Sequence, residues 1–244
     1  VPTDDGKYAS AAVVLQGPAP IREVVTSAEI AFLAEKEGAC WAKGVTQSSR
    51  PDQFLKSLEI TQWGWQQLEE TIKSKYGGYP HYYAQQLQKQ ADTDWLAARP
   101  DDWLRKLYML LGDAIAKGDC DKNVLQRCRI IVVTENKVDN HVSGRSAYFP
   151  KSGSYRELPQ VKRSVLRAAN KKQQKKLEDA LTTLGVTEIG DDERIDLLLS
   201  TYYTEDSEPV GRDRHLQHMK FFIKWWKKSR DSEKFEDHPI FRTA

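Results

Sequence analysis

Apolar residues recur at about every fourth position in two distant segments of the chain, 58–76 and 184–203. Allowing one extra residue in the second copy, the segments agree at Leu58/Leu184, Ile60/Val186, Thr61/Thr187, Trp63/Ile189, Gly64/Gly190, Leu68/Ile195, Ile72/Leu199 and Tyr76/Tyr203. Each copy has a short apolar entry, a glycine at which the chain turns, and then a pattern of helical period. Because residues i and i+4 share one helix face, both copies are predicted to bury the same face.

A second helical pattern follows in each copy, at 103–111 and at 218–226. The aligned apolar positions are Leu104/Met219, Leu107/Phe222, Tyr108/Ile223 and Leu111/Trp226. The first pattern has an apolar face too wide for a surface helix, which predicts a core helix. The second belongs to a predicted helix over 213–229. Its expected apolar face holds Leu216, Met219, Phe222, Ile223 and Trp226, flanked by Phe221 and Trp225, and its opposite strip holds Lys220, Lys224 and Lys227.

Each helical pattern leads to a β-like tail, at 129–150 and at 238–244. In the first tail, β-branched residues at 130–134 and a returning segment at 141–149 predict a hairpin across a polar turn region. The opening residues have the character of a third tail, with Thr3 opposite Thr134 and Leu15 opposite Phe149.

This order predicts a mainly α fold with short β-hairpins, of the α+β class, made of two tandem divergent helical repeats that each end in a hairpin. The predicted parts are a β tail of a preceding repeat (1–18), a first helical repeat with its hairpin (19–150) and a second helical repeat with a truncated tail (151–244). Because the last tail stops in mid-hairpin, we expect the chain to be a fragment of a longer protein. Repeats of this kind usually act as scaffolds.

Further helices are expected, including one that begins at Pro51, because proline is well tolerated at a first helical position. Thr26 or Ser27 can cap a short helix that contains Ile30 and Leu33, with Glu29 near its positive end. Another is predicted over 81–91, and a Lys-rich, mostly exposed helix over roughly 160–183.

Composition is that of an ordinary globular protein: 244 residues, of which 39% are hydrophobic. No apolar stretch approaches the roughly 20 residues of a membrane span, and the first residues lack the basic and apolar regions of a signal peptide. Cys40, Cys120 and Cys128 form no CxxC pair, which argues against a disulfide framework or a zinc ribbon. We therefore expect a cytoplasmic protein without a membrane partner.

The net charge is only +2, but the charges are sorted along the chain. Residues 159–177 hold seven basic residues and no acid, 178–213 hold eleven acids, and 214–230 hold six basic residues and no acid. One interpretation is that neighbouring helices have complementary solvated faces. The other is an anionic partner such as a nucleic acid. Its contacts would be Lys171, Lys172, Lys175, Lys176, Lys227 and Lys228.

Candidate catalytic chemistry is sparse. His215 and His218 are spaced i, i+3 beside Asp213, and Asp237 and His238 follow, which leaves a metal-dependent hydrolase as a further alternative. A metal site needs three or four converging ligands, however, and His218 falls on the apolar side of its helix, as a hydrogen-bonded packing residue does.

Common hydrolase, zincin, dinucleotide and P-loop signatures are absent. Cys40 meets only the minimum for a Cys/His nucleophile, and a buried structural cysteine explains it better. The carboxylate pairs Asp101/Asp102 and Asp191/Asp192 stand at helix starts, where negative charge is stabilising without any catalytic role. We therefore assign no catalytic, cofactor-binding or metal-binding residue, and no cofactor.

The phrases FLKSLEITQWGWQQLEETI, DDWLRKLYMLLGDAI, RIIVVTENKVDNHVSGRSAYFP, ALTTLGVTEIGDDERIDLLLSTYY and HLQHMKFFIKWW resemble the region after the ATPase domain of large bacterial sacsin-like proteins. That family begins with a histidine-kinase/Hsp90-type ATPase fold and continues into helical units with short β-hairpins. The chain lacks the acidic-plus-Asn helix and the DxGxG loop of that ATPase, so no catalytic residue carries over.

The resemblance implies a non-catalytic module downstream of an ATPase, which responds to nucleotide state and contacts other domains or partner proteins as a chaperone's middle region does. The leading hypothesis is thus a helical repeat scaffold for protein contacts, although kinship at the level of the fold does not fix function. The nucleic-acid-binding module is the first alternative and the metal-dependent hydrolase the second.

Overall fold

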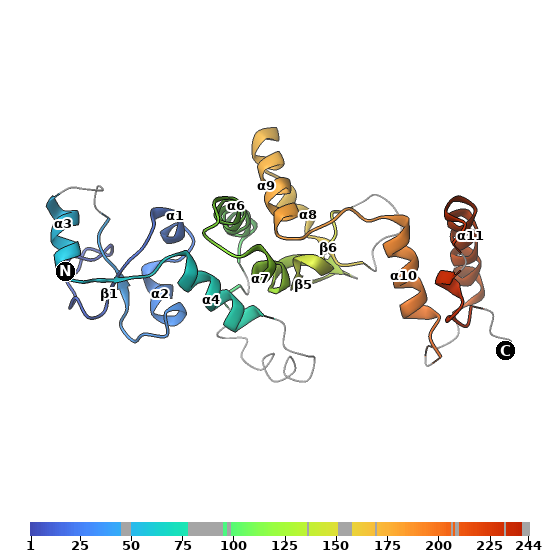
Figure 1. Cartoon of the computed structure of the whole chain (residues 1–244), viewed down its shortest axis with the longest axis horizontal. Helices are drawn as coiled ribbons and strands as arrows, with labels where there is room; N and C mark the ends of the chain where they lie inside the picture. The colour runs from blue at the N-terminus through green and yellow to red at the C-terminus, as the bar shows by residue number, and fades with distance from the viewer. Residues whose placement is uncertain are drawn as a thin grey trace.

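The computed structural model describes residues 1–44, 50–77, 95–96, 99–135, 137–150, 158–168, 170–205, 207, 210–231 and 233–240. The protein is mainly α-helical with two small sheets, which confirms the predicted fold class. Its elements succeed one another along one long axis, with the N-terminus at one end and α11 at the other (Figure 1). The chain exposes 15665 Å² of surface, whereas a compact protein of 28.0 kDa exposes about 11,000 Å².

The N-terminal part is a three-stranded parallel sheet, in the order β2-β1-β3, with helices packed around it. Its elements are β1 (Val14–Gln16), α1 (Ala19–Arg22), α2 (Ser27–Leu33), β2 (Cys40–Trp41), α3 (Arg50–Ser57), β3 (Thr61–Gln62) and α4 (Trp65–Tyr76). Of the two expected caps, Thr26 is the N-cap of α2, and the Glu29 carboxylate accepts hydrogen bonds from the backbone N–H and the hydroxyl of Thr26, as in a capping box.

The middle part holds an antiparallel sheet in the order β5-β4-β6, against which α6 packs. Its elements are α6 (Asp101–Lys117), α7 (Lys122–Arg127), β4 (Arg129–Glu135), β5 (Val138–Ser143), η2 (Gly144–Ser146), β6 (Gln160–Val161), α8 (Arg163–Leu166) and α9 (Lys171–Thr183). The core helix predicted over 103–111 is α6, in which Leu107, Tyr108 and Leu111 are fully buried. The hydroxyl of Tyr108 donates to the carbonyl of Ile130 and so joins α6 to the sheet.

The C-terminal part is a helical hairpin with a small core of its own. It consists of α10 (Asp191–Tyr202), α11 (Arg212–Ser229) and the short η3 (Glu233–Phe235). The main hydrophobic cluster runs from Leu15 to Val186, and a small one of Val14, Ala42, Leu55 and Ile60 lies in the N-terminal part. The hairpin forms a separate cluster of Ile195, Leu198, Leu199, Tyr203, Phe222 and Trp225.

The duplicated segments have the same local structure and bury the same positions. Gly64 is the N-cap of α4 and Gly190 is the N-cap of α10. Of the aligned apolar pairs, both members are buried at Ile60/Val186, Trp63/Ile189, Leu68/Ile195, Ile72/Leu199 and Tyr76/Tyr203. The strand before each glycine is also equivalent, because Thr61 pairs in parallel with Leu15 and Thr187 with Tyr148. The shared helix face predicted from the spacing is therefore confirmed.

Two predicted alignments are wrong by one residue. The strand pairing equates Leu15 with Tyr148 rather than with Phe149, because Leu15 pairs with Thr61 and Tyr148 pairs with Thr187, the equivalent threonine of the second copy. In the second helical pattern, the buried residues of α11 are His218, Phe222 and Trp225. They correspond to Leu104, Tyr108 and Leu111 of α6, one position earlier than predicted.

The predicted hairpin at 130–149 exists, but its turn is tighter. β4 and β5 pair as far as Glu135 and Val138, so most of the expected polar turn region belongs to the strands. The segment after β5 leaves β4, and Tyr148 bridges Gln160 and Thr187. Strand pairing therefore crosses the boundary that the sequence suggested at residue 150. The division into parts at 18 and 150 stays a prediction.

The Lys-rich helix begins at Lys171 and not near residue 160. Gln160 and Val161 pair with Thr134 and Val133 as an edge strand, since a β-branched residue beside β4 completes the sheet. The side chain of Asn170 then accepts a hydrogen bond from the backbone of Gln173 and starts α9 as an N-cap. The helix predicted over 81–91 lies outside the described residues. None of the helices that the structure describes is long and apolar enough to cross a membrane.

Candidate protein-docking surface

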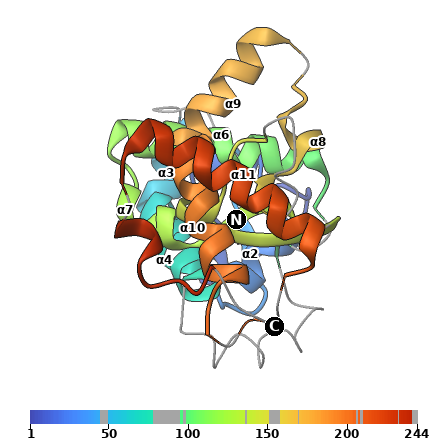
Figure 2. The ribbon, with the colours of Figure 1, turned by 90° about the vertical axis from the view of Figure 1, so that its right-hand side faces the viewer.

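An apolar stripe lies exposed along α11. Leu216 and Ile223 are each 48% exposed and Trp226 is 42% exposed, and Met219 is half-buried between them. Their spacing of i, i+3, i+7 and i+10 places all four on one side of the helix. Figure 2 shows α11 in front of the other elements at this end of the molecule. We call these four residues the α11 stripe.

The opposite side of α11 is fixed to its neighbours. Phe222 and Trp225 are buried, and the rings of both lie against Phe235 at centroid distances of 5.4 and 5.6 Å. The indole N–H of Trp225 donates to the Asp192 carboxylate at the start of α10, at 2.7 Å. Because this side packs into the hairpin core, the α11 stripe is held facing outward.

The sequence predicted that the four residues of the α11 stripe lie on the buried face of the helix. The structure corrects this prediction, because they are exposed or half-buried. Eight of the residues between Leu216 and Trp226 are apolar, aromatic or His, so two adjacent stripes satisfy a helical period equally well. The core selects the stripe of His218, Phe222 and Trp225 because these residues contact Tyr203 and Phe235. Lys220, Lys224 and Lys227, which lie beside the α11 stripe, are exposed as expected.

The three histidines that the sequence offers as candidate metal ligands all contact Tyr203. The Tyr203 hydroxyl lies 3.1 Å from Nδ1 of His215 and 3.0 Å from Nδ1 of His218. Nδ1 of His238 lies 3.1 Å from the Tyr203 backbone carbonyl, so it donates to that oxygen. Burial raises the pKa of Tyr203 to about 12, so its hydroxyl stays protonated and can bond one of the two imidazoles as donor.

Asp213 does not join this cluster; it is exposed in the first turn of α11. Across the residues that the structure describes, no group of three or more His, Cys, Asp or Glu side chains is arranged to hold a metal ion. His218 is 7% exposed and hydrogen-bonded, which is the packing role that its sequence position suggested.

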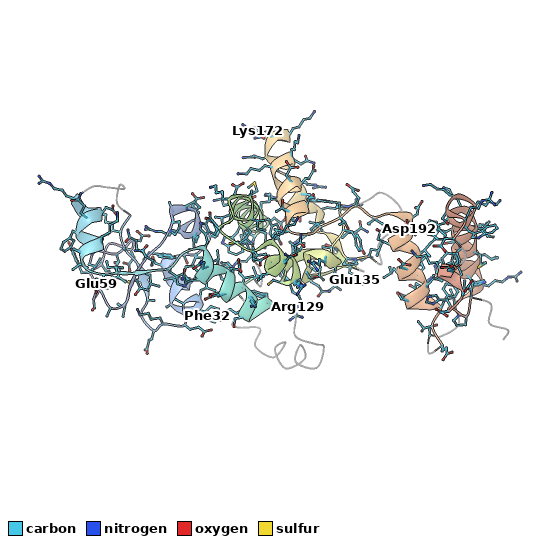
Figure 3. All side chains as sticks on the ribbon, viewed as in Figure 1. Phe32, Glu59, Arg129, Glu135, Lys172 and Asp192 are labelled. Atoms are coloured by element: carbon cyan, nitrogen blue, oxygen red, sulfur yellow. The ribbon has the colours of Figure 1, made fainter. Side chains whose placement is uncertain are left out.

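The predicted anion-contacting lysines lie on two separate elements. Lys171, Lys172 and Lys175 are exposed on the half of α9 that projects from the middle of the molecule, and Figure 3 shows Lys172 directed away from it. Lys176 pairs with Asp113 of α6, at 2.7 Å. Lys227 and Lys228 belong to α11, at the far end of the long axis (Figure 1). The structure does not bring the two basic stretches together on one surface.

The cysteines have no features of a catalytic nucleophile. Cys120 and Cys128 are buried, and burial raises the pKa of their thiols to about 12 and about 11. Burial also raises the pKa of the half-buried Cys40. A thiol with a raised pKa is protonated at neutral pH and is a poor nucleophile.

A cavity of about 210 Å³ lies between α1, α4 and α6, with Trp65, Lys106 and Asp113 among its lining residues. It is smaller than the roughly 300 to 1,000 Å³ of typical small-molecule sites. Its residues do not include any of the histidines or cysteines.

The contact between α6 and α9 shows how one helix docks on another within this chain. Gly112 faces Ala180 so closely that a Cβ atom on Gly112 would lie 2.6 Å from the Ala180 Cβ. Beside this contact, Lys176 pairs with Asp113. The guanidinium of Arg105 donates to the carbonyl of Ser164 at 2.8 Å. An apolar contact flanked by charged pairs is the typical anatomy of a helix docking site.

Comparison of the chain with protein-family models, with curated proteins and with solved structures finds no match. The resemblance to sacsin-like proteins therefore stays a prediction.

Proposed function

We propose that the chain is a non-catalytic helical repeat scaffold, which mediates contacts with other domains of its own chain or with partner proteins. The single observation that carries this proposal is the exposed α11 stripe on a helix whose other side is fixed in a core. Contiguous exposed apolar residues rimmed by polar ones mark protein contact sites. The resemblance to the region downstream of the ATPase in sacsin-like proteins supports the same role, in the cytoplasm.

The test is site-specific photo-crosslinking in cells that express the chain. A photoreactive phenylalanine analogue placed at position 223, in the α11 stripe, should form adducts with protein that survive nuclease treatment. The matched control is the same analogue at position 138, where Val138 is 57% exposed on β5, outside the stripe. Equal adducts at both positions, or adducts that nuclease removes, would contradict the proposal.

Nucleic-acid binding remains a second candidate because the free half of α9 carries Lys171, Lys172 and Lys175, and no ion pair among the described residues includes them. Phosphate contacts make log affinity fall linearly with log salt. An electrophoretic shift assay at low and at moderate salt tests this function. The triple change of these lysines to Glu should abolish a specific shift, whereas Lys227→Glu with Lys228→Glu tests α11 separately.

A further inference from the structure

The corrected alignment of α6 with α11 gives the α11 stripe an internal counterpart. Pairing the buried residues Leu104, Tyr108 and Leu111 with His218, Phe222 and Trp225 sets the register. In that register Arg105 corresponds to Met219, Met109 to Ile223, Gly112 to Trp226 and Asp113 to Lys227. The stripe thus occupies the side of α11 that corresponds to the side of α6 bound by α8 and α9.

On α6, Gly112 on this side is buried, Arg105 and Met109 are half-buried, and Asp113 is exposed but ion-paired. Gly112 is in close contact with Ala180, Asp113 pairs with Lys176, and Arg105 donates to backbone carbonyls of α8. On α11 the corresponding residues are exposed or half-buried. The same helix side that receives a helix within the chain therefore carries an uncovered apolar stripe one repeat further on.

The charge beside the contact is reversed between the two helices. Asp113 meets the basic helix α9, but its counterpart is Lys227, and Lys220 and Lys224 lie along the same edge of the stripe. A basic helix such as α9 would place lysine against lysine there, which is destabilising. The complementary occupant carries acidic residues along that edge.

We propose that the α11 stripe binds an acidic amphipathic helix of a partner protein, in the position that α9 occupies on α6. This rests on the proposed scaffold function and specifies its partner. The partner helix inserts small apolar residues opposite the Trp226 indole, which stands where Gly112 allows close approach on α6, and its carboxylates pair with Lys220, Lys224 and Lys227. Such helix-in-groove binding uses apolar anchors at i, i+3 or i+4 and i+7.

A second copy of the chain is a poorer occupant. Two α11 helices packed face to face and antiparallel would bring the lysine edges of both stripes together, with six lysines against two acids, the Asp213 of each copy. The acids of α10 are engaged within the hairpin, since Asp192 accepts from Trp225 and Asp196 pairs with Lys234 at 2.9 Å.

Binding is measured by fluorescence anisotropy on the full chain with two designed peptides. Both have the sequence of residues 170–184, with capped ends and the same i, i+4 hydrocarbon staple, because isolated helices this short are marginal in water. One keeps the four lysines of α9, and the other has Lys171, Lys172, Lys175 and Lys176 changed to Glu. We expect the acidic peptide to bind at least about tenfold more tightly than the basic one.

Three variants of the chain show where the peptide binds. Ile223→Ser with Trp226→Ser should abolish binding, and circular dichroism should show the same helix content because both side chains lie outside the hairpin core. Lys220→Glu with Lys224→Glu and Lys227→Glu should reverse the preference toward the basic peptide. The matched control, Lys171→Glu with Lys172→Glu and Lys175→Glu, should bind as the unmodified chain does.

The proposal is overturned if the acidic peptide does not bind, if binding survives the double serine change, or if the α9 control loses it. It is equally overturned if sedimentation shows a dimer of the chain that the serine changes dissociate, because a second copy then covers the stripe. If photo-crosslinking from position 223 gives protein adducts but the acidic peptide does not bind, the scaffold function is supported and an acidic helix as its partner is excluded.

Discussion

Tyr76 and Tyr203 occupy the same position in the two repeats, and the hydroxyl of each takes part in a hydrogen bond that ties its helix to a neighbouring segment. Tyr76 accepts from the backbone N–H of Leu96, at 3.1 Å. Tyr203 lies between the imidazoles of His215 and His218. Both repeats thus have a tyrosine at this position, but its hydrogen-bond partner is a backbone N–H in the first and histidine side chains in the second. This explains why the tyrosine repeats in the sequence and the histidines do not.

Replacing Tyr203 by Phe should lower the free energy of unfolding by about 1 to 2 kcal/mol. The change removes the hydroxyl and leaves two buried or half-buried imidazoles without that partner, and such losses have this typical size. Urea denaturation at neutral pH measures the effect. Tyr8→Phe is the control, because Tyr8 is 84% exposed and its replacement should change stability by less than about 0.5 kcal/mol.

The raised pKa of Tyr203 also predicts a dependence of stability on pH. Its pKa is about 12 in the folded protein against an ordinary value of 10. The unfolded state loses the phenol proton from about pH 10, whereas the folded state keeps it until about pH 12. The contribution of Tyr203 to the free energy of unfolding is therefore complete below pH 10 and is lost as the pH rises toward 12.

The measurement compares the parent with Tyr203→Phe by urea denaturation at pH 8 and at pH 11. The difference between the two proteins should shrink at the higher pH, since lysine and other tyrosine titrations affect both alike. A difference that stays constant from pH 8 to pH 11 would show that Tyr203 ionises equally in the folded and unfolded states.

At the scale of elements, the contact of α6 with α9 decides how the two repeats join. A glycine inside a helix costs about 1 kcal/mol relative to alanine, so Gly112 needs a reason, and the reason is the close approach of Ala180. Small residues at a helix crossing allow the backbones to approach and bring Lys176 to Asp113.

Gly112→Ala should therefore destabilise the protein by about 1 to 3 kcal/mol through overpacking, against the gain in helix propensity. Thermal or urea unfolding measures the change. The double variant Gly112→Ala with Ala180→Gly moves the methyl group across the interface and should recover part of the loss, as a coupling between the two sites. If the double variant is as unstable as the sum of the single ones, the two residues do not share this contact.

At the scale of the whole molecule, the repeats are joined end to end along one axis and leave much surface exposed (Figure 1). The hairpin of α10 and α11 forms a cluster apart from the main core. An elongated arrangement of this kind suits a protein that holds partners along its length.

Small-angle scattering should give a radius of gyration clearly above the roughly 18 Å expected for a compact domain of this length. Elongation arises because each part packs chiefly on the next. A value near 18 Å would mean that the hairpin folds back on the main core in solution. The variant Ile223→Ser with Trp226→Ser is a useful control, because a fold-back through the α11 stripe would be released by it.

Much of this fold could be predicted because local pattern and burial agree. The pairs Leu68/Ile195 and Ile72/Leu199 lie four residues apart on one helix face, and both helices bury them. The glycines before those helices and the cap at the start of α2 are short-range signals of the same kind. The predicted scaffold role and the sacsin-like resemblance stay predictions.

The sequence by itself determined the period of the helices, the starts of α2, α4 and α10 and the repetition of the units, because these depend on residues a few positions apart. Tertiary structure decided which of two apolar stripes on α11 is buried, that Gln160 and Val161 complete a sheet, and that His215 and His218 meet Tyr203. These choices depend on which surfaces are available from distant segments, and residue spacing carries no information about that availability.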